Sequence, residues 1–189
     1  MTATDYLKIP KERVGVLIGK KGETKKRIEE LTQLELEIDS EAGSIVINSY
    51  DELEDPLMPW KTKSLITAIG RGFNPEIAMK LLDDDMVLEV IKLTEYVGKS
   101  KKALSRYKGR IIGREGITRQ IILEMTGVDM SVYGKTVSLI GDLETMLIAK
   151  EAVEMILHGA RHKSVYAFLE RKKQDLKMKQ FQESITLKR

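Results

Sequence analysis

One stretch of this chain occurs twice, and this repetition constrains the fold more than any other feature. Residues 14–32 align with residues 108–126 at an offset of 94 residues, without a gap. The identical pairs include two glycines three residues apart and the residues that follow them: Gly19 and Gly113, Gly22 and Gly116, Thr24 and Thr118, Ile28 and Ile122, Thr32 and Thr126. Length alone allows one large domain or two small ones. The repeat predicts two small domains of the same fold.

The segments around the two copies predict the same order of elements. Alternating or short apolar runs bounded by turns indicate three strands per copy, at residues 6–9, 34–38 and 45–47 and at residues 87–93, 128–132 and 137–140. A helix is expected after the last strand of each copy, at residues 59–71 and 143–157, the latter behind the N-cap Asp142. Each copy then has the order strand, helix, Gly-x-x-Gly, helix, strand, strand, helix. The predicted fold class is α+β, with each three-stranded sheet packed against three helices.

The remaining segments divide the chain into four parts. We expect a first domain at residues 1–72, a linker helix at 73–85, a second domain at 86–160, and a C-terminal helix with a basic tail at 161–189. The second copy has about a dozen extra residues before its glycines, so its first helix should be longer and more basic. The linker and C-terminal helices carry apolar stripes and are expected to join the two domains into one rigid body.

The paired glycines have a physical reason if a phosphate backbone passes close to the peptide chain. Glycine permits a tight turn and leaves room for a ligand. The loop leads into the N-terminus of a helix, where free N–H groups and the helix dipole favour an anion. Two glycines at this spacing are also common in ordinary turns, so one copy alone would mean little. Their recurrence within the same order of elements favours phosphate binding.

Charge follows the same repeat. Residues 8–27 contain eight basic and two acidic residues, and residues 99–119 contain eight basic residues and one acidic residue. Residues 28–59, in contrast, contain ten acidic residues and no basic one. A single charged run is usually a solvated surface, but recurrence at the motif predicts a cationic surface beside each loop and a separate acidic face.

This pattern resembles the KH family, whose signature is Ile-Gly-x-x-Gly between two helices. The order of elements matches its eukaryotic-type (type I) arrangement. The resemblance implies two tandem KH domains that bind single-stranded RNA, each loop clamping about four nucleotides. We expect no catalytic residue, no metal and no cofactor. The expected RNA-binding residues are Leu17, Ile18, Gly19, Lys20, Lys21, Gly22, Lys25 and Lys26 in the first domain and Arg110, Ile111, Ile112, Gly113, Arg114, Glu115, Gly116 and Arg119 in the second.

A closer resemblance, to the family called Partner of Nob one or Dim-two, covers nearly the whole chain. It is carried by residues 72–82, 109–119, 131–137 and 166–170, and the compact archaeal form is the best match. The resemblance implies binding to small-subunit ribosomal RNA near its 3′ end during ribosome assembly. It also implies two protein partners, the Nob endonuclease and the alpha subunit of an archaeal initiation factor.

The loops themselves add two expectations to this resemblance. Eukaryotic members of the family tend to have a degenerate first domain without the glycine loop, whereas this chain keeps Gly19-Lys20-Lys21-Gly22. Both loops are therefore expected to bind RNA. An acidic residue such as Glu115 opposes a phosphate, but Gly-Arg-Glu-Gly is usual in the family's second domain. Arg114 is then the expected contact in that loop.

Three other interpretations of the chain compete with this one. A metal enzyme could use His158 and His162, but Gly159 stands where a metalloprotease motif has glutamate, and no third ligand is apparent. The three aspartates at residues 83–85 are expected to end the linker helix, because consecutive helical residues do not share a face for magnesium. A protein–protein adaptor would use the acidic stretch at residues 28–59 for docking. The third alternative is a generic RNA-binding protein that is unrelated to ribosome assembly.

Four aromatic residues are candidates for stacking on bases. Trp60 and Tyr166 lie in apolar-periodic helices, where packing in the core is the commoner role. Tyr133 ends a strand beside Gly134 and is open to either role, and Tyr107 is the fourth candidate.

Composition narrows the class of protein further. There is no cysteine, which rules out disulfides, thiolate metal sites and thiol nucleophiles. Apolar runs are shorter than the ~18 residues that span a bilayer, and the first residues lack the charged-then-apolar pattern of a secretory signal. We therefore expect a cytoplasmic protein that does not enter a membrane.

Overall fold

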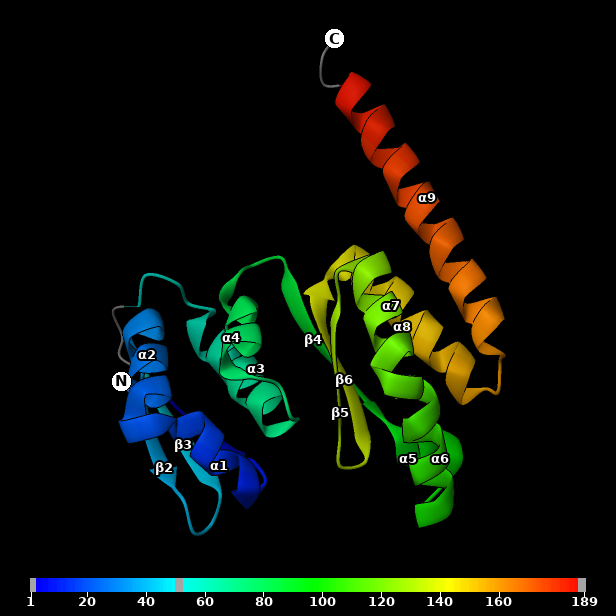
Figure 1. Ribbon diagram of the computed structural model, residues 1–189. Helices are drawn as coiled ribbons and strands as arrows, with labels where there is room; N and C mark the ends of the chain where they lie inside the picture. Colours follow the sequence, from blue (N-terminus) through cyan, green and yellow to red (C-terminus); the bar gives the residue numbers. More distant parts are fainter. Residues whose placement is uncertain (1–2, 50–52, 187–189) are drawn as a thin grey trace.

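The structure is a computed structural model that describes residues 3–49 and 53–186. Two three-stranded antiparallel sheets are each covered by helices, as Figure 1 shows. The strand order is β1-β3-β2 in the first sheet and β4-β6-β5 in the second. The third strand of each unit is thus central, and β2 and β5 are edge strands. This arrangement confirms the predicted α+β fold.

The first domain contains the elements expected from the repeat. These are β1 (Ala3–Lys8), α1 (Lys11–Ile18), the short 3-10 helix η1 (Lys20–Gly22), α2 (Glu23–Thr32), β2 (Glu35–Asp39), β3 (Ser44–Ser49) and α3 (Met58–Gly70). Alternate residues of β3 are buried, which is the period of a strand with one face on the core.

The second domain repeats this order with an insertion. Its elements are β4 (Met86–Lys92), α5 (Leu93–Val97), α6 (Lys101–Ile112), the 3-10 helix η3 (Arg114–Gly116), α7 (Ile117–Thr126), β5 (Asp129–Tyr133), β6 (Thr136–Asp142) and α8 (Leu143–Leu157). The side chain of Asp142 accepts a hydrogen bond from the Thr145 N–H (3.0 Å), which confirms the predicted N-cap. Helix α6 has 12 residues against 8 in α1, and the remaining inserted residues include the separate helix α5.

The linker differs from the single helix that we expected. It consists of α4 (Pro75–Ala78) and the 3-10 helix η2 (Met79–Leu82). Ala78 and Leu81 are buried in the core of the first domain, and that core also includes Ile140 of β6. Residues 136–141 of β6 are all buried. The linker and the second sheet therefore share one core with the first domain.

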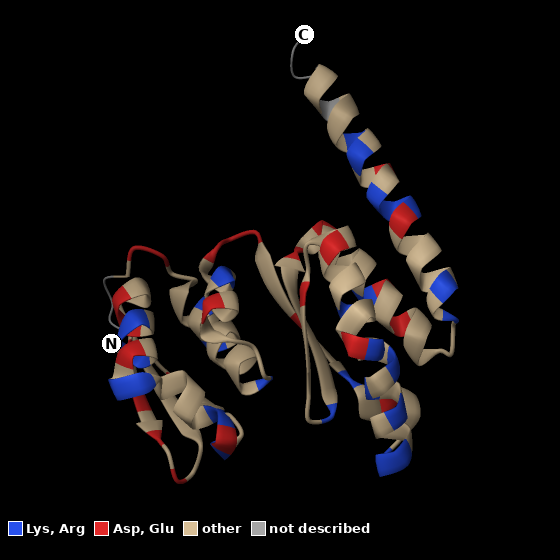
Figure 2. Ribbon diagram, viewed as in Figure 1, with Lys and Arg blue, Asp and Glu red and all other residues tan. Residues whose placement is uncertain are grey.

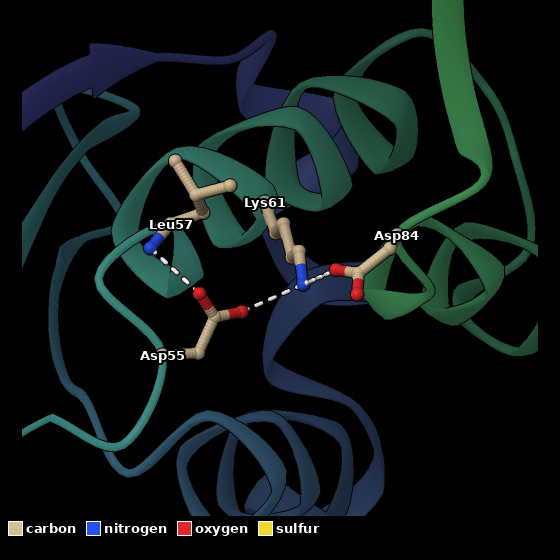
Figure 3. A network of polar contacts seen from close by, with 4 residues as sticks. All are labelled: Asp55, Leu57, Lys61 and Asp84. Carbon is tan, nitrogen blue, oxygen red and sulfur yellow. Dashed lines mark hydrogen bonds and ion pairs between the residues drawn. The ribbon is translucent and has the colours of Figure 1, made fainter.

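A lysine holds the start of the second sheet against the first domain. Lys61 of α3 has a side chain that is only 8% exposed, and its ammonium group donates to Asp55 Oδ2 (2.6 Å) and to Asp84. Asp55 also accepts from the Leu57 N–H (2.8 Å), as Figure 3 shows. The hydrogen bond from Lys61 lowers the pKa of Asp55, and the bonds to Asp55 and then Asp84 raise the pKa of Lys61. The aspartate run ends the linker and positions the turn before β4.

Helix α9 (His162–Thr186) packs on α7 and α8 of the second domain, with contacts that reach the ion pair between Lys179 and Glu144 (2.7 Å), and its C-terminal end extends away from the molecule (Figure 1). Val165, Phe168 and Leu169 are buried in the second core. Farther along, Met178, Phe181 and Ile185 are exposed. The expectation that this helix joins the two domains is wrong, because the linker and the second sheet make that connection.

Candidate nucleic-acid interface

The two glycine loops have the same backbone conformation. Gly19 has φ 73° and ψ 177°, and Gly113 has φ 78° and ψ 170°. The third loop residue is left-handed in both, with φ 53° at Lys21 and at Glu115. Non-glycine residues adopt this conformation rarely and at a cost in strain. The two loops therefore share their backbone geometry as well as their sequence, including the strained residue at the third position.

The two glycines of each loop serve different purposes. A Cβ atom at Gly19 would lie 2.2 Å from the Thr24 hydroxyl, and one at Gly113 would lie 2.3 Å from the Thr118 hydroxyl. The first glycine is thus required for the close approach of the loop to the following helix. A Cβ at Gly22 or Gly116 would meet nothing within 4 Å. The second glycine faces open space, so a ligand backbone can reach the peptide groups there.

Basic side chains surround both glycine loops. Lys20, Lys21 and Lys26 are exposed at the first loop, and Arg114 and Arg119 are exposed at the second. Lys25 is half-buried and pairs with Glu29 at 3.6 Å. Figure 2 also shows Lys and Arg gathered on α6, which leads into the second loop. Glu115 is exposed and its side chain is free of the protein core.

Three predicted contact residues are corrected by their burial and bonding. Leu17 and Ile111 are completely buried in the two domain cores, so they support the loops from beneath and do not line a groove. Ile18 and Ile112, the next residues, are half-buried and reach the surface. Arg110 donates to the carbonyls of Ile156 (3.1 Å) and Ala160 (2.6 Å), so its guanidinium group holds the end of α8.

The second loop receives support from α9. The Tyr166 hydroxyl lies 2.8 Å from the Thr118 hydroxyl, and Thr118 is fully buried against Gly113. A ring nitrogen of His162, Nε2, lies 2.7 Å from the Arg110 carbonyl on the other side of the loop. In the first domain the matched residue, Thr24, borders a hollow of about 240 Å³ next to the linker. The second loop is the better supported of the two.

A cleft of about 370 Å³ opens between the two domains beside the second loop. Its lining from the second domain is Ile112, Arg119, Ser131, Val132 and Tyr133, and its lining from the first domain and linker is Arg13, Gly72, Phe73, Asn74 and Ile77. Ile112 immediately precedes the loop, and Arg119 follows it within the first turn of α7. Sequence reasoning identified the loop side of this cleft but not the opposite wall, because the repeat carries no signal for contacts between the domains.

Tyr133 joins the two domains and so does not act as a free stacking surface. Its hydroxyl donates to Glu12 Oε1 (2.5 Å), and the Arg13 guanidinium lies 5.8 Å from the centre of its ring. The hydrogen bond lowers the pKa of Glu12 and raises the pKa of Tyr133. Trp60 is 61% exposed, so the expectation that it packs in the core is wrong. Tyr166, in contrast, is half-buried and packs against the second core.

The two histidines bond to different groups. His158 Nδ1 lies 2.7 Å from the Glu154 carbonyl, and His162 contacts Arg110 as described above. In the part of the chain that the structure describes, no three His, Cys, Asp or Glu side chains are grouped in a way that could hold a metal ion. Among the same residues, no helix has the length and apolar character of a membrane span.

Comparison with known proteins agrees with this architecture. Residues 87–174 match the eukaryotic-type KH domain (KH domain type I), and residues 4–54 match the KH domain. A KH domain-containing protein of Methanocaldococcus jannaschii is 52% identical over 94% of this chain and 78% of its own length.

Three solved structures are similar over nearly the whole chain. One is Dim2p from Pyrococcus horikoshii, with 53% identity, a TM-score of 0.84, and coverage of 89% of this chain and 99% of that one. The second is the complex of a/eIF2alpha, aDim2p and rRNA from the same organism, with 52% identity, a TM-score of 0.87, and coverage of 92% and 96%. The third, a protein of unknown function from Aeropyrum pernix, is 36% identical, with a TM-score of 0.93 and 98% coverage of both chains. The chain therefore belongs to the Partner-of-Nob-one/Dim-two family of proteins with two KH domains, in its archaeal form.

Proposed function

We propose that this protein binds single-stranded RNA on both Gly-x-x-Gly loops. The observation that carries the proposal is the repeated loop geometry, in which a glycine faces open space among exposed lysines and arginines. Phosphates would lie at the loops, against the N-termini of α2 and α7. Ile18 and Ile112, which precede the loops and reach the surface, would contact the bases. This proposed function does not involve catalysis.

We further propose that the RNA is small-subunit ribosomal RNA near its 3′ end, bound during ribosome assembly in the cytoplasm. The aDim2p protein of Pyrococcus horikoshii, found in a complex with rRNA and a/eIF2alpha, is 52% identical to this chain and supports the assignment. The alpha subunit of an archaeal initiation factor is then a proposed partner. The Nob endonuclease is another, and it rests on the family resemblance alone.

The first test measures affinity for a single-stranded RNA of about eight nucleotides, long enough for the ~4 nucleotides of each loop. Fluorescence anisotropy at two salt concentrations gives the salt dependence, which reports how many phosphates are neutralised. The variant Lys20→Asp/Lys21→Asp/Arg114→Asp keeps all four loop glycines. We expect it to bind more weakly and with a shallower salt slope than the native chain. Equal affinity and slope in both proteins would refute binding at the loops.

A second candidate function, protein docking, is favoured by the outer face of the first sheet. Tyr6 is 72% exposed on this face, and the strand register places it in line with Val46 and Glu37. Glu35 and Asp39 are exposed on the same side of β2. This face is acidic and suits a basic protein surface, whereas it repels RNA. Capture of the initiation-factor subunit that is lost in Glu37→Lys, with RNA binding intact, would assign this face to the partner.

A further inference from the structure

The cleft between the domains lies directly beside the second loop. Ile112 and Arg119 flank that loop and also line the cleft, and Val132 lies on β5, one of the two edge strands of the second sheet. An edge strand leaves a row of backbone N–H and C=O groups unpaired, and these groups can bond to a base. A nucleotide next to those clamped by the loop therefore lies within reach of the cleft.

The opposite wall of the cleft is held in place by several contacts. Arg13 donates from Nε to the Ile69 carbonyl (2.8 Å) and from Nη2 to the Phe73 carbonyl (2.7 Å). The Ser131 hydroxyl donates to the Arg71 carbonyl (3.0 Å). These bonds fix the chain at the end of α3 against β5. The wall thus exists before any ligand arrives, which reduces the entropic cost of binding.

Gly72 permits this close approach. Its φ of +96° lies in the region that favours glycine, and a Cβ there would lie 2.7 Å from the Ser131 hydroxyl and 2.9 Å from Tyr133 Cβ. Any larger residue would push the linker away from β5 and widen the cleft. The width of the cleft is therefore set by the contact of Gly72 in the first domain with Ser131 and Tyr133 in the second.

The chemistry of the lining suits a nucleotide. Ile77, Ile112 and Val132 offer apolar surface to a base, and the guanidinium groups of Arg13 and Arg119 offer positive charge to a phosphate. The lining beside β2, the corresponding edge strand of the first sheet, is different. The hollow beside β2, of about 230 Å³, is lined by Glu37, Ile38, Asp39, Ser44 and Val46, which all come from that sheet and include two carboxylates.

We infer that the cleft is a nucleotide subsite of the second RNA site, and that the first domain supplies one of its walls. The inference rests on the proposed function, because the RNA strand that reaches the cleft is the strand held by the second loop. It assigns to Ile77 and Asn74 a contact with RNA that neither the repeat nor the loop motif contains. The RNA bound to the second KH domain then also contacts residues of the first domain and the linker.

The test uses the full chain with Lys20→Asp and Lys21→Asp, so that RNA is held at the second loop. A single-stranded RNA of about six nucleotides exceeds the ~4 that one loop clamps. Ile77→Trp fills the cleft from the first-domain wall. Glu76→Trp, the matched control, adds the same bulk one residue earlier, where the side chain is exposed and borders the other side of the linker. Melting temperatures establish that both variants are folded.

We expect Ile77→Trp to raise the Kd about tenfold, which is ~1.4 kcal/mol, and Glu76→Trp to leave it unchanged. Photocrosslinking of the same RNA, with 4-thiouridine at each position in turn, should link at least one position to the peptide 72–79 in the protein without the tryptophan. Equal affinity for both tryptophan variants, or crosslinks to second-domain peptides alone, would overturn the inference while leaving the second loop as an RNA site. Absence of RNA binding by the native chain would overturn the proposed function itself.

Discussion

Replacing Tyr166 by phenylalanine tests whether α9 supports the second loop. The tyrosine hydroxyl lies 2.8 Å from the hydroxyl of Thr118, which is fully buried. Leaving one partner of a buried hydrogen bond unsatisfied costs ~1–3 kcal/mol. For a chain of this size each kcal/mol lowers the melting temperature by about 2–4 °C. We expect Tyr166→Phe and Thr118→Val each to destabilise the protein by this amount.

The double variant separates the contact from general packing. When both partners are replaced by apolar groups of the same shape, the unsatisfied group disappears, so the double variant should cost less than the sum of the single ones. Urea denaturation of the four proteins gives the coupling energy, which we expect to be ~0.5–1.5 kcal/mol. Thr24→Val is the matched control in the first domain, where the equivalent threonine borders a hollow. Additive single costs, within error, would refute the coupling between α9 and the loop.

Three further predictions concern charged residues. Arg114→Asp should weaken binding of a short single-stranded RNA by ~1–3 kcal/mol without a change in melting temperature, because a phosphate contact is replaced by repulsion; unchanged affinity in a direct titration would contradict it. Lys20→Asp/Lys21→Asp should weaken the binding of a four-nucleotide RNA less than Arg114→Asp does. The same variant should have a larger effect on an RNA long enough to reach both loops than on the four-nucleotide RNA. Loss of short-RNA binding in this variant but not in Arg114→Asp would make the first loop the principal site. Asp55→Asn should destabilise the protein at pH 7. Because Lys61 lowers the pKa of Asp55 in the folded state, the stability that Asp55 contributes is present above its unfolded pKa of about 3.9 and is lost as the pH falls through the lower folded value. Urea denaturation at several pH values should therefore show the difference between the two proteins shrinking in acid, and a constant difference would contradict the assignment.

The sequence predicted the fold of each domain because the signals involved are local. A Gly-x-x-Gly between two helices, alternating strands and the N-cap Asp142 depend on residues close together in the chain, and the 94-residue repeat allowed each assignment to be made twice. The linker was harder. Pro75 and Asn74 mark the start of a helix correctly, but tertiary packing of Ala78 and Leu81 in the first core breaks the segment into two short helices.

The candidate site was predicted at the loops and missed between the domains. Leu17 and Ile111 were expected to bind RNA because they lie just before the loops, whereas the helix period turns their side chains into the core. Arg110 was expected to contact RNA because it is basic and lies close to the loop. Its guanidinium group instead donates to two carbonyl groups at the end of α8. Contacts such as that of Tyr133 with Glu12 join residues far apart in the sequence. No local pattern records them.

The most direct test of the central claim is ultraviolet crosslinking of the native chain to RNA in cell extract, followed by sequencing of the attached RNA. The Lys20→Asp/Lys21→Asp/Arg114→Asp variant is the control. We predict that reads concentrate on the small-subunit ribosomal RNA near its 3′ end and fall sharply in the variant. Reads concentrated on other RNAs would contradict a role in ribosome assembly, and reads that the variant retains in full would contradict binding at the loops.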